Sequence, residues 1–212
     1  MSFVERSLSG HRSADDYSGS VRHSCLVVCL GFAAIVLAGC GPTGPGDPAG
    51  TKADPVYLLS VLPTPAGLID TQRERPADAT QLVDAIIGSN DRDKATSVAR
   101  SGVEEAAVRR WKSATPGTMV ASVSVWPGHQ VASNVAVTVG QTQLGQPGTS
   151  GWTPSQNPGS TGTRSSTGDR IRVLARAVGP NVFVVRATGG VSDDSVIRTM
   201  RRLIQVQGGV SS

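Results

Sequence analysis

An uncharged run near the N-terminus restricts where a folded domain can begin. Residues 25–38 read CLVVCLGFAAIVLA and contain no charged side chain. This run is shorter than the roughly 20 apolar residues that a helix needs to cross a bilayer, and it has the length of the apolar core of a secretory signal. The Gly- and Pro-rich tract 41–50 follows, and such a tract neither continues a helix nor packs into a core. We therefore expect a flexible linker up to about residue 55 and a folded domain after it.

The end of the apolar run carries a specific motif. Residues 37–40 read Leu-Ala-Gly-Cys, which resembles the lipobox of bacterial lipoproteins. The resemblance implies that 1–39 is a signal peptide, cleaved between Gly39 and Cys40, and that a diacylglyceryl group is attached to the Cys40 sulfur. Two acyl chains hold a protein stably on a membrane. The implied location is the extracytoplasmic face of the cell membrane, with the membrane itself as a partner.

The residues before this signal are unusual. The segment 1–20 contains Glu5, Asp15 and Asp16, whereas a signal peptide normally starts with basic residues. We hypothesise that translation starts at Val21, which would place Arg22 just before the apolar run. A buried core helix is the alternative interpretation of that run, and the Gly/Pro tract directly after it argues against this alternative.

Cysteine and histidine usage narrows the chemistry of the exported part. All three cysteines, Cys25, Cys29 and Cys40, lie within the first 40 residues. The exported part therefore has no thiol for an internal disulfide, a thiolate zinc site or cysteine catalysis. His129 is its one histidine, so we expect no metal site and no cofactor. Aromatic residues make up only 4% of the chain, and the core must therefore consist mainly of Val, Ile, Leu and Ala.

Periodicity and capping signals predict the elements of the domain. Asp78 with Gln81 forms a capping pattern, residues 118–126 alternate as a half-buried strand, and Gly179-Pro180-Asn181 indicates a hairpin turn. The expected elements are a strand or extended segment at 56–62, helices at 78–87 and 93–111, a strand at 118–126, a helix (or else a strand) at 130–139, a long loop or two short strands over 140–169, hairpin strands at 171–178 and 182–188, and a helix capped by Ser192.

Together these elements predict a single α+β domain over residues 56–207, followed by a short tail at 208–212. The expected architecture is an antiparallel or mixed sheet with helices packed on one face. The pattern also resembles that of uncharacterised secreted lipoproteins of actinobacteria. The matching features are the strand ending at Trp126, the loop with Trp152 and Asn157-Pro158-Gly159, and the Gly179 hairpin followed by a helix. This resemblance implies no particular function.

No catalytic constellation is evident. A Ser-His-Asp site would have to use His129, which follows Pro127-Gly128 at a turn. The neighbouring Asp193 and Asp194 are most simply explained by the start of a helix, where negative charge is favourable. We therefore predict no catalytic residues.

The basic balance of the C-terminal part suggests a partner class. Residues 164–202 contain eight arginines and three aspartates. No aromatic platform accompanies them, which argues against nucleic acid. Anionic lipid or an acidic envelope polymer could be attracted to such a surface, and a solvated face is the alternative. The candidate ligand edge comprises Trp126, His129 and Trp152, although the tryptophans could instead fill the core.

The sequence thus predicts a membrane-anchored lipoprotein whose exported domain is a non-enzymatic binding or accessory module of the cell envelope, with a lipid, polymer or protein as ligand. Two alternatives stay open. One is a cell-envelope hydrolase with a carboxylate site, and the other is a structural or assembly lipoprotein that acts through a protein interface.

Overall fold

The computed structural model describes residues 51–88 and 92–210. The predicted signal peptide, its cleavage site, Cys40, the proposed start at Val21 and most of the linker lie outside the described residues. Pro42–Ser212 forms one compact unit that contains every described element. A chain that starts at Pro42 therefore carries the complete domain with its own core, as an independently folding domain does.

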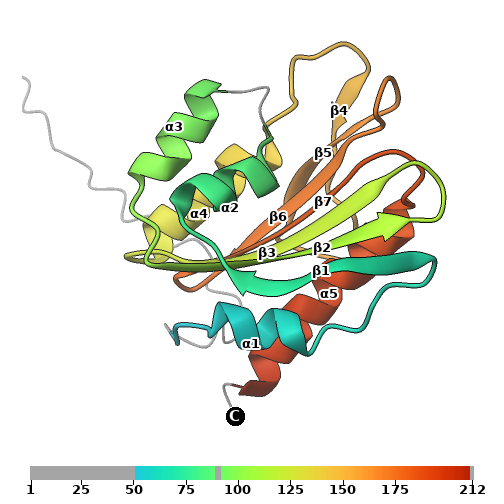
Figure 1. The fold of residues 1–212 in the computed structure, drawn as a ribbon. Coiled ribbons are helices and arrows are strands. Elements are labelled where there is room, and N and C mark those ends of the chain that lie inside the picture. The colour runs from blue at the N-terminus through green and yellow to red at the C-terminus, as the bar shows by residue number, and fades with distance from the viewer. Residues whose placement is uncertain (1–50, 89–91, 211–212) are drawn as a thin grey trace, which may run out of the picture. The chain divides into compact units, whose positions relative to one another are not determined.

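One antiparallel sheet of seven strands organises the domain (Figure 1). The strands are β1 (Leu68–Pro76), β2 (Glu105–Ser113), β3 (Thr118–Val125), β4 (Thr149–Gly151), β5 (Thr161–Ser165), β6 (Arg172–Val178) and β7 (Asn181–Ala187). Their order is β1-β2-β3-β7-β6-β5-β4, and every neighbouring pair runs antiparallel. The predicted α+β class and single domain are confirmed.

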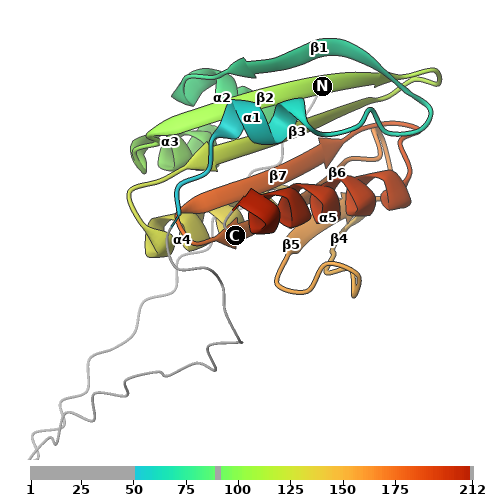
Figure 2. The same ribbon diagram turned by 90° about the horizontal axis from the view of Figure 1, so that it is seen from below.

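Helices cover both faces of this sheet, which corrects the expectation of helices on one face. The α5 face carries α1 (Pro55–Ser60) and α5 (Asp193–Val210), and the α4 face carries α2 (Ala79–Ile86), α3 (Arg92–Arg100) and α4 (His129–Gly140). Figure 1 shows the second group above the strands and the first below them, and Figure 2 shows α1 and α5 side by side. None of the described helices is long and apolar enough to cross a membrane.

Two hydrophobic clusters, one on each face, explain this arrangement. Along β3, Met119 and Val123 belong to the cluster under α1 and α5, and Val120 belongs to the cluster under α2 and α4. Alternation along the strand was expected to separate a buried side from a solvated side. Instead Val120–Trp126 are all buried, because each side of the strand meets a helix.

The segment predicted as a strand at 56–62 is the helix α1. The Asp54 carboxylate accepts a hydrogen bond from the backbone N–H of Tyr57 at 2.9 Å, and Pro55 occupies the first turn. Both features favour a helix start. Before this helix, the Asn181 side chain bonds to Ala53 N–H and Thr51 C=O, each at 2.9 Å, so the contacts of the domain begin before residue 56.

The helix predicted at 93–111 is confirmed up to Arg100 and wrong beyond it. α3 ends at Arg100, Gly102 adopts a φ of +77°, and the chain then enters β2. The recurring small residues that mimic a helix face include Ala106, which is buried in the sheet beneath α2. β2 lies between β1 and β3, and these non-local pairings override the local spacing. β1 was not predicted, because its sequence LIDTQRERP contains only two large apolar residues.

Several local predictions are confirmed. The Asp78 carboxylate accepts from the Gln81 N–H at 2.8 Å at the start of α2. Ser192 Oγ accepts from the Ser195 N–H at 3.2 Å at the start of α5, and the helix extends to Val210. The predicted hairpin is β6–β7, with Gly179 at a φ of +55°. The segment 130–139 is helical, and 140–169 contains the two short strands β4 and β5.

Candidate functional site

The three residues of the predicted ligand edge are separated in the structure. Trp126 is fully buried in the cluster of the α4 face, and its indole N–H donates to Ser124 Oγ at 2.9 Å. Trp152 is 8% exposed and belongs to the cluster of the α5 face. His129 is exposed at the start of α4. Because the two tryptophans lie on opposite faces of the sheet, they do not line one groove.

The loop around Trp152 packs on the C-terminal helix. The Asn157 amide donates to the Ile197 carbonyl at 3.0 Å, and Arg176 donates to the Pro158 carbonyl at 2.6 Å. Asn157 is buried. These bonds attach the loop to α5 and β6. The loop is long because it packs against both of these elements.

The paired aspartates at the start of α5 are both engaged by arginines. Asp193 forms ion pairs with Arg164, at 3.3 Å, and with Arg172. Asp194 lies 3.7 Å from Arg198, one helical turn further on. Across the part of the chain that the structure describes, no group of three His, Cys, Asp or Glu residues could hold a metal ion.

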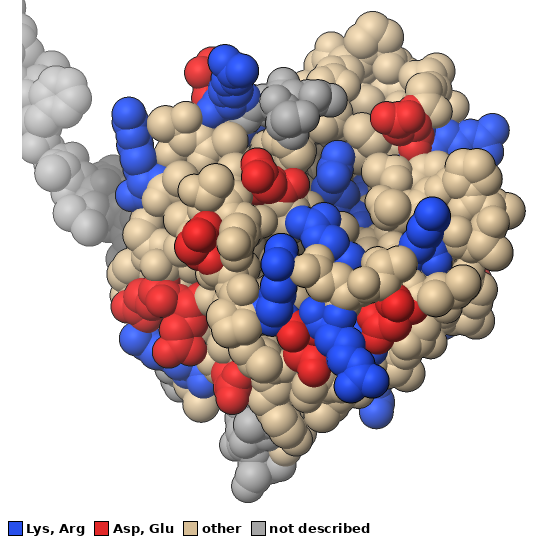
Figure 3. All heavy atoms as spheres, viewed as in Figure 1, with Lys and Arg blue, Asp and Glu red and all other residues tan. Residues whose placement is uncertain are grey.

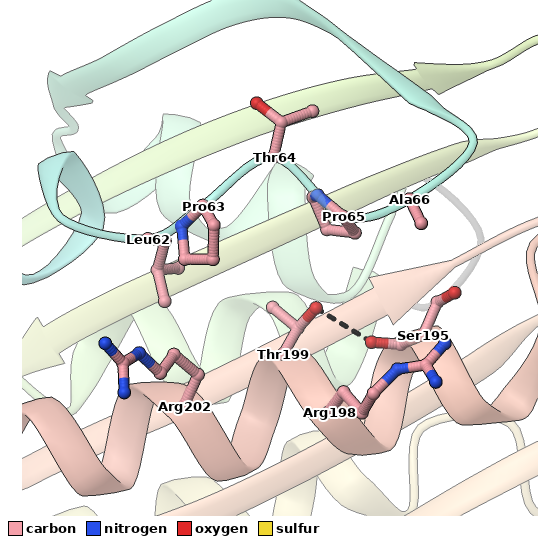
Figure 4. Close-up of a pocket in the computed structure, with 9 residues that line it drawn as sticks. All are labelled: Leu62, Pro63, Thr64, Pro65, Ala66, Ser195, Arg198, Thr199 and Arg202. Atoms are coloured by element: carbon pink, nitrogen blue, oxygen red, sulfur yellow. Dashed lines mark hydrogen bonds between the residues drawn. The ribbon is translucent and has the colours of Figure 1, made fainter.

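A cavity of about 300 Å³ lies on the α5 face, between the loop that joins α1 to β1 and the helix α5 (Figure 4). The loop contributes a mostly apolar wall, and α5 contributes a polar wall with two cations one turn apart. The lining residues are Leu62, Pro63, Thr64, Pro65, Ala66, Ser195, Arg198, Thr199 and Arg202.

The buried Arg109 of β2 holds the loop wall in place. Its guanidinium donates to the carbonyls of Leu59 and Leu62 at 2.8 and 2.7 Å, and to Asp70 Oδ2 at 2.5 Å. The guanidinium also lies 5.1 Å from the centre of the Trp111 ring, within range of a cation–π contact. The first residue of the wall is therefore attached to the sheet, and the cavity has a rigid side.

The helical wall is ordered by bonds within α5. Thr199 Oγ1 donates to the Ser195 carbonyl at 2.8 Å, as Figure 4 shows, and Ser195 Oγ lies 3.0 Å from Ser192 Oγ. None of the described residues that line the cavity is a carboxylate or a histidine. A serine without a neighbouring base is not an activated nucleophile. The wall thus offers positive charge and hydroxyl groups, which suits binding of an anion.

Reasoning from the sequence missed this cavity. The sequence predicts only a strand or extended segment at 56–62, and it places Arg198 and Arg202 among the basic residues of 164–202, for which a solvated face is the alternative. A usable signal was present, since Arg198 and Arg202 stand four positions apart and share one flank of α5. What covers that flank, however, is set by the position of α1 and its loop.

Comparisons with known proteins leave the family open. No family model matches the chain, and no curated protein matches it. Among solved structures, the extracellular domain of PknH from Mycobacterium tuberculosis is similar, with 11% sequence identity and a TM-score of 0.42 over 69% of this chain and 84% of that chain. At this level the likeness assigns neither a family nor a function.

Proposed function

We propose that this chain is a lipoprotein held on the extracytoplasmic face of the cell membrane through Cys40, and that its exported domain is a non-enzymatic binding module. The anchoring half of the proposal rests on residues 37–40 and on the apolar run before them. The binding half rests on the cavity of the α5 face, whose ligand is a small anionic amphiphile.

One observation carries the choice of ligand. The cavity sets an apolar wall, including Leu62 and Pro65, opposite Arg198 and Arg202, and no carboxylate among the described lining residues neutralises them. Arg198 has an exposed ion pair with Asp194 at 3.7 Å, and an exposed pair of this kind contributes little. A ligand with an apolar body and one carboxylate, sulfonate or phosphate would satisfy both walls.

The geometry favours binding over hydrolysis. Two carboxylates of β1, Asp70 and Glu74, do lie close together, but both face the guanidinium of Arg109, at 2.5 and 4.0 Å. Because both carboxylates are paired with a buried arginine, a structural role explains why they lie close together. A carboxylate hydrolase and an assembly lipoprotein therefore stay predictions from the sequence that no contact among the described residues favours.

Anchoring is tested by substituting Cys40→Ala, with Cys29→Ala as the matched control inside the same apolar run. Lipid attachment predicts that the first variant keeps its leader, loses the mass of the diacylglyceryl group and is absent from the lipid-modified fraction. The control should be processed and modified as the wild type is. Equal masses for wild type and Cys40→Ala would contradict the proposal.

Binding is tested on the domain that starts at Pro42, with anilinonaphthalene sulfonate as an anionic amphiphilic probe. We expect saturable binding that Arg202→Gln weakens by about tenfold, since a charge-assisted hydrogen bond is worth about 1.5–3 kcal/mol. Arg201→Gln is the matched control, because Arg201 is exposed on the same helix and does not line the cavity. Equal weakening by both variants would show that general charge attraction accounts for binding.

A further inference from the structure

The α4 face of the sheet carries a pair of arginines that the function proposed above does not use. In the register of the sheet, Arg110 of β2 lies opposite Val120 of β3, and Val120 lies opposite Arg186 of β7. Residues paired across antiparallel strands project to the same side. Val120 belongs to the cluster of the α4 face, so both arginines project toward that face and flank Val120.

This pair sits in a wider gathering of basic side chains. Arg75 of β1 is paired with Val108, another residue of the same cluster, and therefore points the same way. The Gln72 side-chain oxygen, oriented toward Arg75, accepts from its Nε and Nη1 atoms at 2.9 and 3.0 Å. In Figure 3 blue side chains gather near the centre of this view, with red side chains beside them.

Arg186 is held in an environment that disfavours its own charge. Its Nε atom is fully buried and forms no hydrogen bond. Burial lowers the pKa of Arg186, the neighbouring charge of Arg110 lowers that pKa further, and Asp169 opposes these effects. The guanidinium also packs on Gly88 at the end of α2, where an added Cβ would lie 3.0 Å from Nη2.

Two other arginines that are partly or fully buried in this domain have carboxylate partners, and a third, Arg176, donates to the Pro158 carbonyl. Arg109 is paired with Asp70, and Arg172 with Asp193. Among the described residues, neither Arg110 nor Arg186 forms an ion pair or a hydrogen bond through its side chain. A desolvated cation without an ion pair is costly, and the charge of Asp169 only partly offsets this cost for Arg186. Such a group beside a second cation is a candidate site for an anion.

We propose that Arg110 and Arg186 bind a phosphate group on the α4 face of the sheet. β2 and β7 are two strand spacings apart, about 10 Å, a gap that two arginine side chains can close from both sides above Val120. One guanidinium saturates a two-oxygen carboxylate by bidentate pairing. A phosphate monoester has three terminal oxygens and close to two negative charges, and so matches two guanidinium groups. This site lies on the opposite face from the cavity under α5 and does not depend on it.

The phosphate monoester could belong to a soluble ester or to a phospholipid such as phosphatidic acid, and the experiment separates the two. The domain that starts at Pro42 is titrated calorimetrically with inorganic phosphate at constant ionic strength, with sodium chloride as the reference. In parallel it is sedimented with vesicles of phosphatidic acid and phosphatidylcholine, and with vesicles of phosphatidylcholine alone.

We expect saturable binding of inorganic phosphate or of the phosphatidic acid vesicles, weakened at least tenfold by Arg186→Met and by Arg110→Met. Arg201→Met, on the far face, should bind as the wild type does. Response to inorganic phosphate without vesicle binding identifies a soluble ester, and the reverse identifies a head group. The proposal is overturned if neither probe binds, if chloride competes equally, or if both folded arginine variants bind as the wild type does.

Discussion

Each face of the sheet holds an arginine on an inner strand. The arginine on one face is paired with carboxylates, whereas the arginine on the other face forms no ion pair within the described residues. On the α5 face, Arg109 is 7% exposed and is surrounded by Asp70, Glu74 and two carbonyl groups. On the α4 face, Arg186 has a fully buried Nε without an acceptor, and its pKa is lowered by burial and by the charge of Arg110.

This difference indicates that the charge of Arg109 has a structural role and that the charge of Arg186 is a candidate for binding a ligand. The partners of Arg109 come from α1, the loop after it and β1, so the residue joins three elements and fixes one wall of the cavity. The side chain of Arg186 forms no hydrogen bond within the described residues. A satisfied polar network rigidifies a core, whereas a buried donor without an acceptor calls for an explanation, and a bound ion is one.

The largest expected effect comes from removing the satisfied charge. Arg109→Met leaves Asp70 and the carbonyls of Leu59 and Leu62 without their donor, and we expect a loss of about 3 kcal/mol in the free energy of unfolding. Urea denaturation of the domain measures it. Arg73→Met, an exposed position on β1, is the control and should change stability little. A loss below about 0.5 kcal/mol, the usual range of a surface substitution, would remove the basis of the contrast.

Removing the unpaired charge of Arg186 should raise the free energy of unfolding. Arg186→Met deletes a partly buried cation and its repulsion with Arg110 while keeping most of the apolar stem. In phosphate-free buffer we expect a gain of about 1 kcal/mol, at the low end of what replacing buried charges yields. The same denaturation experiment compares the variant with wild type, and marked destabilisation would mean that Arg186 has a partner within the fold.

The smallest expected effect concerns salt. Raising sodium chloride from about 0.02 M to about 0.5 M shortens the screening length severalfold, which weakens the repulsion between Arg110 and Arg186. The stability gain of Arg186→Met over the wild type should then shrink by a few tenths of a kcal/mol. A gain independent of salt would assign the whole effect to burial of Arg186 rather than to the neighbouring charge.

The fold was predictable where signals are local. The caps at Asp78 and Ser192 act on backbone N–H groups three residues away, and the turn at Gly179 depends on its positive φ. These features gave α2, α5 and the β6–β7 hairpin their predicted places. The strand β2 was mistaken for a helix, because its alanines at short spacing fit either structure until β1 and β3 pair with it.

The candidate sites were not predictable from the sequence, because they too depend on elements that are distant in the chain. The cavity needs the loop from Leu62 to Ala66 to lie beside α5, and the arginine pair needs β3 to separate β2 from β7. The predicted edge failed as a unit because Trp126 and Trp152 face opposite sides of the sheet.

By itself, the sequence determined the leader motif at 37–40 as a pattern, the absence of cysteine after Cys40, and the helices and hairpin marked by caps and turns. These depend on residues a few positions apart. Only the tertiary structure decided that both faces of the sheet are covered, that Arg109 forms an ion pair with Asp70, and that Arg186 lies near Arg110 and forms no ion pair within the described residues. Such facts depend on strand order and register, through which residues distant in the chain become neighbours and acquire or lack a counter-charge.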